Sequence, residues 1–242
     1  MSSKQPSTKP PDPQKPLKHV DVLQNQASLL FANLHPVLLL SLVPFSFKSL
    51  VNDPVNTLLG LAPTVALVQA IYCVVCLPST GQTPPPAHKP GQKKKSGKPV
   101  QDIWARVVPA LLSFLLTLFL TTPLLYITTI LFGAPLISHH LHTILLSLHL
   151  ALLTTPQLFY VHGLDLSTWL RLVSLQQPVD EMYGMSLGTF VGAWLGAIPI
   201  PLDWDREWQR WPVTIVCGAY AGAVVGKVVG GFLFKGARMK MN

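Results

Sequence analysis

A run of 58 residues, from Val107 to Leu164, contains no Asp, Glu, Lys or Arg. A helix crosses the apolar layer of a bilayer with about 20 residues, so this run is too long for a single crossing. The Gly133-Ala134-Pro135 step near its middle is a strong turn signal. The run therefore predicts two membrane helices joined as a hairpin.

Other stretches of the chain are similarly poor in charge. Val22–Phe47, Pro54–His88 and Met182–Leu202 carry no charged residue, and Trp211–Phe234 carries one, a lysine. Charged residues make up 12% of the whole chain, whereas a soluble domain has about 25%. We expect an all-α integral membrane protein, a bundle of about six transmembrane helices. Their expected positions are near residues 28–47, 55–77, 105–130, 136–160, 183–200 and 212–234.

The Lys and Arg residues predict the orientation in the membrane. If the N-terminus is inside, 14 of them fall in cytosolic segments, and three, Lys48, Arg206 and Arg210, fall on the other side. Membrane proteins accumulate Lys and Arg in their cytosolic loops, so we expect both termini in the cytosol. Because the net charge of +8 comes from tails and a loop beside spans, we expect no nucleic-acid partner.

The remaining segments complete the expected organisation. We expect a disordered cytosolic tail at 1–27 and a disordered basic cytosolic loop at 78–104, both rich in Pro and Lys. A cytosolic loop with an amphipathic segment follows at 161–182, and a cytosolic tail at 235–242. The spans form pairs at 28–77, 105–160 and 183–234. In the last tail, Arg238 and Lys240 resemble a retrieval signal for the endoplasmic reticulum.

Glycines recur every four residues in the last two predicted spans. They are Gly184, Gly188, Gly192 and Gly196 in the first, and Gly218, Gly222, Gly226 and Gly230 in the second. Residues four apart share one helix face, so each span has a stripe where another backbone can approach closely. Two interpretations are open: the stripes pack against each other within the bundle, or at least one receives a helix of another protein.

The segment between these spans, residues 199–212, is rich in tryptophan and charge. Trp204, Trp208 and Trp211 are spaced to share one face if the segment is helical. The segment is either a lumenal cap at the membrane surface or a lumenal docking element for a partner or a lipid headgroup. The other candidate docking residues are Pro201, Asp203, Asp205 and Arg206. Two nearby carboxylates lack the further ligands that a divalent cation needs, so we predict no metal site.

Lys227 is the only formal charge well inside a predicted span. It can reach the membrane surface with its flexible side chain, or pair with a carboxylate or a lipid phosphate. His139, His142 and His149 share one face of the fourth span. Each is either a neutral histidine bonded to a neighbouring helix or part of a proton relay or metal site. Cys73 and Cys76 are expected to pack, or to be palmitoylated, rather than to form a disulfide in the reducing cytosol.

The residues 190–197, 199–206 and 208–212 resemble the C-terminal signature of the PIG-F family. The resemblance implies a role in making glycosylphosphatidylinositol (GPI) anchors in the membrane of the endoplasmic reticulum. It implies a non-catalytic, cofactor-free subunit that binds and stabilises a large catalytic subunit of the PIG-O or PIG-G type. Those catalytic subunits transfer ethanolamine phosphate to mannoses of the GPI precursor, a lipid that this chain could also contact.

Other functions remain open from the residues alone. The longest expected lumenal segment has about a dozen residues and no cluster of Asp and His, so it has no room for metal-dependent transfer chemistry. One alternative is a small transporter or lipid scramblase with a polar path along Lys227, His149 and the proline-kinked helices. A second alternative is an intramembrane enzyme that uses the histidine cluster.

Overall fold

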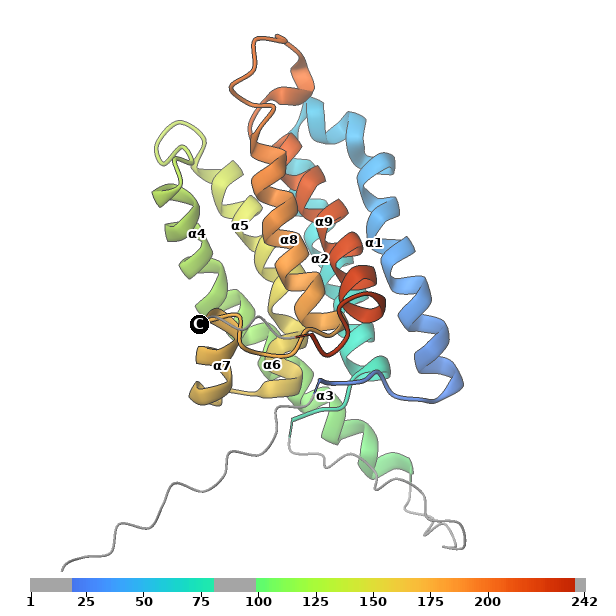
Figure 1. The fold of residues 1–242 in the computed structure, drawn as a ribbon. Coiled ribbons are helices and arrows are strands. Elements are labelled where there is room, and N and C mark those ends of the chain that lie inside the picture. Colours follow the sequence, from blue (N-terminus) through green and yellow to red (C-terminus); the bar gives the residue numbers. More distant parts are fainter. Residues whose placement is uncertain (1–18, 81–98, 238–242) are drawn as a thin grey trace, which may run out of the picture.

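The computed structural model describes residues 19–80 and 99–237, which form a bundle of helices without strands (Figure 1). The first half contains α1 (Gln26–Asn52), α2 (Pro54–Ile71), the π-helix η1 (Tyr72–Cys76), α3 (Pro99–Leu116), the π-helix η2 (Thr117–Thr121) and α4 (Thr122–Leu131). The second half contains α5 (His140–Thr154), α6 (Pro156–His162), α7 (Leu166–Val173), α8 (Glu181–Ala197), the short 3-10 helix η3 (Glu207–Gln209) and α9 (Val213–Phe232).

Both described ends of the chain lie at the same end of the bundle. The side chains of Asp21 and Lys235 form an ion pair there, with 2.7 Å between Oδ1 and Nζ. We call this end, which is the lower one in Figure 1, the tail end. Residues 198–212 stand out at the opposite end, which we call the loop end.

Five of the described helical stretches are long and apolar enough to cross a membrane. They are Gln26–Asn52, Pro54–Cys76, Ile103–Leu131, His140–His162 and Val213–Phe232. The predicted all-α multi-pass class is confirmed, but this count is five rather than six. The missing member is α8, which has 17 residues and so reaches about 25 Å. It ends at Ala197, just before Pro199 and Pro201, which cannot continue a helix.

Prolines in the helices leave carbonyl oxygens without their usual backbone donor, because proline has no N–H. At three of them, the carbonyl four residues earlier accepts a hydrogen bond from a side chain of another segment. Two of these prolines, Pro36 and Pro109, lie inside helices, and the third, Pro156, is the first residue of α6, directly after α5. The side chain of Lys227 donates to the carbonyl of Ala32 (2.9 Å), that of Ser79 to Ala105 (3.4 Å) and that of Gln69 to Leu152 (3.0 Å). The helices are thus tied together where prolines weaken them.

The expected disordered segments are shorter than predicted in the described part of the chain. Residues 19–27 belong to the structured tail end: the N–H of Leu23 donates to the carbonyl of Cys76 over 2.8 Å, and α1 begins at Gln26. Residues 78–80 are likewise fixed, since the N–H of Thr80 donates to the carbonyl of Tyr160. Apolar contacts of Val20 and Val22 with the core explain the difference. Residues 99–104 of the expected basic loop are also ordered, because they belong to α3. Residues 1–18, 81–98 and 238–242, which include most of that loop and Arg238 and Lys240, lie outside the described residues.

The apolar core has two parts along the bundle. One contains Leu58, Leu146 and Tyr220 between α2, α5 and α9, and the other contains Tyr72, Tyr160 and Met182 at the tail end. α8 and α9 lie side by side against α5 and α1, respectively (Figure 1). One side of the α8–α9 pair remains uncovered by the rest of the described chain, since Val191, Val225 and other side chains are exposed there.

Candidate functional site

The glycine stripes of α8 and α9 face each other. A Cβ atom added to Gly188 would lie 2.2 Å from the carbonyl oxygen of Gly222, and one added to Gly192 would lie 2.0 Å from that of Gly218. The eight stripe glycines all meet backbone atoms of the opposite helix or of its flanking residues in this way. The structure thus shows the first of the two interpretations, in which each stripe is the partner of the other.

An apolar groove runs along the uncovered side of this pair. Its volume is about 980 Å³, and it extends from Val179 and Ala237 at the tail end to Gly196 and Gly218 near the loop end. Glycine backbone forms its floor, and aliphatic side chains of both helices form its walls. No charged residue of the described part of the chain lines it. The groove is therefore a surface for an apolar occupant.

The loop at 198–212 is not a continuous helix. Only Glu207–Gln209 is helical, so the three tryptophans do not share a helix face. The rings of Trp204 and Trp208 lie 5.9 Å apart, whereas Trp211 packs on the core. The side chain of Gln209 holds the loop together, because its Nε2 donates to the carbonyls of Pro199 and Leu202 over 2.7 and 2.9 Å.

A polar pocket of about 560 Å³ lies within this loop. The predicted residues Asp203, Asp205 and Arg206 line it together with Arg210 and Trp211. The indole Nε1 of Trp211 is buried and has no hydrogen-bond partner among the described residues. Pro201 and Trp204 are exposed nearby. The loop thus gathers both signs of charge on an exposed surface directly beyond the α8–α9 pair.

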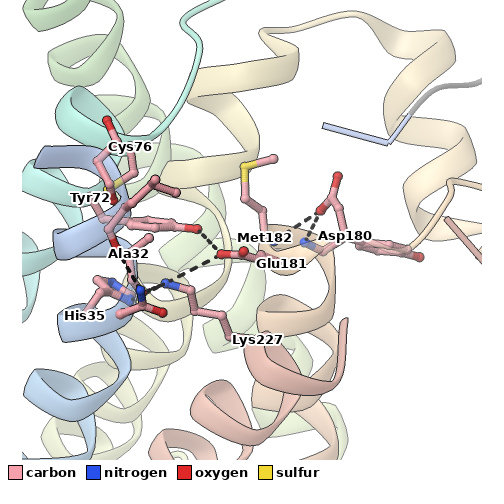
Figure 2. A network of polar contacts seen from close by, with 12 residues as sticks. Ala32, His35, Tyr72, Cys76, Asp180, Glu181, Met182 and Lys227 are labelled. Carbon is pink, nitrogen blue, oxygen red and sulfur yellow. Dashed lines mark hydrogen bonds and ion pairs between the residues drawn. The ribbon is translucent and has the colours of Figure 1, made fainter. Parts of the chain in front are cut away.

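Lys227 lies in a second site, at the other side of α9, which we call the Lys227 network (Figure 2). Its Nζ donates to the carbonyl of Ala32 at 2.9 Å and to Nδ1 of His35 at 3.3 Å. Its ammonium lies 3.9 Å from Oε2 of Glu181 and 4.1 Å from the ring centre of Tyr72. The predicted carboxylate partner of Lys227 is therefore Glu181, at the first position of α8.

The donor and the acceptor of each hydrogen bond from Lys227 through His35 to Gln69 can be assigned. Gln69 Nε2 donates to the carbonyl of Leu152, so its Oε1 faces Nε2 of His35, at 3.0 Å. The histidine therefore carries its proton on Nε2 and accepts from Lys227 through Nδ1. The network joins α1, α2, α5, α8 and α9. Both of its end acceptors, Ala32 and Leu152, are carbonyls freed by proline.

His149 is held in a similar way in the middle of the bundle. Its Nε2 lies 2.9 Å from the carbonyl of Leu58, and its Nδ1 lies 2.7 Å from the hydroxyl of Tyr220. A carbonyl only accepts, so Nε2 carries the proton and Nδ1 accepts from the tyrosine. Both ring nitrogens are thereby used by protein groups, which is the arrangement of a neutral structural histidine.

The other predicted polar candidates do not join these sites. His139 and His142 have rings 5.0 Å apart near the loop end, away from His149. Among the described residues, no group of three or more His, Cys, Asp and Glu could hold a metal ion. Cys73 and Cys76 are fully buried as free thiols, so they pack in the core.

A carboxylate at the tail end begins α8. Oδ1 of Asp180 accepts from the N–H groups of Met182 and Tyr183, and Oδ2 accepts from that of Val20. Burial raises the pKa of this carboxyl, and the three N–H donors oppose that rise. Asp180 thus fixes the first turn of α8 and holds the N-terminal segment against it.

Sequence reasoning missed His35, Gln69 and Glu181 as partners of Lys227. The signal for two of the acceptors was present, because each proline in a helix marks a free carbonyl four residues earlier. Which donor reaches that carbonyl depends on how distant helices pack.

Comparison with known proteins places these features in a family. The family model described as GPI biosynthesis protein family Pig-F matches residues 34–231. A Neurospora crassa protein named glycosylphosphatidylinositol anchor biosynthesis protein 11 is 46% identical over 92% of this chain and 81% of its own length. A mouse protein named GPI ethanolamine phosphate transferase, stabilizing subunit, is 40% identical over 51% of this chain and 57% of its own. No solved structure matches the chain.

Proposed function

Because the chain belongs to the PIG-F family of GPI biosynthesis proteins, we propose that it is a non-catalytic subunit of a GPI ethanolamine phosphate transferase. In this role it binds and stabilises a large catalytic subunit, of the PIG-O or PIG-G type, in the membrane of the endoplasmic reticulum. The names of the mouse and human relatives support the stabilising role. Both termini face the cytosol, and the loop at 198–212 faces the lumen.

The observation that carries this proposal is the use of the polar groups inside the bundle. Lys227, His35, Gln69 and His149 bond to other helices of the same chain. These polar groups inside the bundle therefore hold the helices of this chain together. What it offers to other molecules is surface: the apolar groove of α8 and α9 and the charged loop beyond it.

The same observation weakens the two alternatives. A transport path along Lys227 needs the ammonium to be free to exchange partners, but a carbonyl, a histidine and a carboxylate surround it. An enzyme that uses the histidine cluster needs its members together, but His149 is separated from His142 by about two helical turns and from His139 by nearly three. Neither alternative gains support from the geometry.

The proposal is tested by co-expression with a tagged catalytic subunit. Affinity purification from mild detergent should yield both chains, and the amount of the catalytic subunit should fall when this chain is left out. Trp204→Ala and Arg206→Ala in the loop should lower the yield of the pair, because we propose the loop as a lumenal docking element. Lys48→Ala, on the same side of the membrane in this topology, is the control. Wild-type chains that purify separately would contradict the stabilising role.

A further inference from the structure

The walls of the α8–α9 groove repeat every four residues. Leu187, Val191 and Leu195 of α8 form one wall, and Ala221, Val225 and Val229 of α9 form the other. These are the i±4 ridges of two helices that run side by side. The groove is lined by α8 from Gly184 to Gly196, which is most of this helix of about 25 Å.

A helix fits this shape better than other apolar occupants. Ridges four residues apart are the surface into which a ridge of a third helix packs. The glycine floor lets the backbone of that helix approach closely, which a lipid chain does not need. A second copy of this chain fits poorly, because a two-fold interface pairs the same surface of both copies. Two hollow surfaces placed face to face would leave a void.

We propose that the α8–α9 groove receives an apolar transmembrane helix of the catalytic subunit. This inference rests on the proposed function and names the surface where that function is exerted. The groove is apolar along its length, so packing rather than charge selects the helix. The groove reaches Gly196 at the end of α8, and the loop at 198–212 continues from that end (Figure 1), so the lumenal flank of the bound helix meets Asp203, Arg206 and their neighbours.

The stripe glycines themselves cannot test this proposal. Leucine in place of Gly192 or Gly222 would force α8 and α9 apart and would damage the chain before any partner is bound. The wall residues are suitable, because a larger side chain there fills the groove from the outside. Ala221→Trp and Val225→Trp do this on α9, where Val225 is 60% exposed. Val37→Trp on α1 is the matched control, since Val37 is 61% exposed outside the groove.

The experiment measures how much co-expressed catalytic subunit purifies with each variant in mild detergent. We expect at least a tenfold loss with Ala221→Trp and Val225→Trp, and wild-type recovery with Val37→Trp. The melting temperature of each purified variant must equal that of the wild type, which separates lost binding from lost folding. If wild-type chains bind and the groove variants bind equally well, the groove is not the interface, although the proposed function stands. If even the wild-type chains do not bind, the proposed function fails first.

Photo-crosslinking identifies the occupant directly. A benzoylphenylalanine at position 225 should form an adduct with a peptide from a membrane helix of the catalytic subunit. The same probe at position 37 should not. Adducts that contain only lipid, or only a second copy of this chain, would overturn the proposal.

Discussion

Lys227 stands where Pro36 has removed a hydrogen-bond donor. The Nζ atom of Lys227 lies 2.9 Å from the carbonyl oxygen of Ala32, four residues before that proline in α1. Lys227 lies nearer the tail end than the centre of α9, so its charge costs less than the about 2.5–3.5 kcal/mol that insertion scales give for the centre of a membrane helix. The lysine offsets part of this cost, because it donates a hydrogen bond to a carbonyl that receives none from a backbone N–H.

The first prediction follows from this pairing. Lys227→Met keeps the length of the side chain but leaves the carbonyl of Ala32 unserved, so it should destabilise the protein by about 1–3 kcal/mol. Pro36→Ala restores the backbone N–H, so Lys227→Met should cost less in that background. The double-mutant cycle is measured by unfolding in mixed micelles. Pro44→Ala, in the same helix, is the control and should leave the cost unchanged. Equal costs in all backgrounds would refute the pairing.

The close contact of α8 and α9 gives the second prediction. Gly188→Ala or Gly222→Ala places a methyl group about 2 Å from a carbonyl oxygen of the other helix, which the backbone cannot avoid without moving. We expect a destabilisation of about 1–3 kcal/mol, measured as a fall in melting temperature. Gly60→Ala in α2 is the control, because its new methyl group would meet nothing within 4 Å. It should be neutral or stabilising, since alanine favours a helix more than glycine does.

Much of this architecture could be predicted from the sequence, because its main determinants are local. Runs without charge and the Gly133-Ala134-Pro135 turn predicted the helices, and the residues at 190–212 predicted the PIG-F family, which the comparisons confirm. The four-residue glycine spacing predicted two close-packing faces. It did not decide what each face meets, because spacing describes one helix and not its neighbour.

The partners of Lys227 could not be predicted for the same reason. His35 and Glu181 lie far from Lys227 in the sequence, and only the packing of α1 and α8 against α9 brings them together. The helical face that the spacing of Trp204, Trp208 and Trp211 allows does not form, because Gln209 bonds two carbonyls of the loop and holds it in a non-helical shape. A spacing that suits a helix forms one only when no tertiary contact opposes it.

The third prediction separates structural histidines from a functional cluster. Tyr220→Phe removes the donor to Nδ1 of His149, so it should cost about 1–3 kcal/mol of stability. His142→Ala should cost much less, because His142 is only partly buried. Neither variant should change the transferase activity of a complex assembled at equal amounts of the catalytic subunit. A loss of activity in His142→Ala without a loss of stability would revive the histidine-cluster alternative.

The fourth prediction concerns pH and Asp180, which lies at the start of α8. Burial raises the pKa of its carboxyl in the folded protein. The stability that comes from protonation is fully present below the unfolded pKa and is lost as the pH rises through the folded pKa. Asp180→Asn keeps an oxygen for the N–H groups of Met182 and Tyr183 without a charge. The melting temperature of Asp180→Asn relative to wild type should therefore be higher at pH 7 than at pH 4.

Asp165, which begins α7, is the control of opposite sign for this measurement. Hydrogen bonds from Ser167 and Thr168 lower the pKa of its carboxyl to about 2. The ionised carboxylate therefore stabilises the folded protein above the unfolded pKa, and this stability is lost as the pH falls through about 2. The melting temperature of Asp165→Asn relative to wild type should therefore be lower at pH 7 than at lower pH. Because each variant is compared with wild type at the same pH, the titration of other groups cancels. If the melting temperatures of both variants, relative to wild type, change in the same direction with pH, the buried environment of Asp180 does not control its charge.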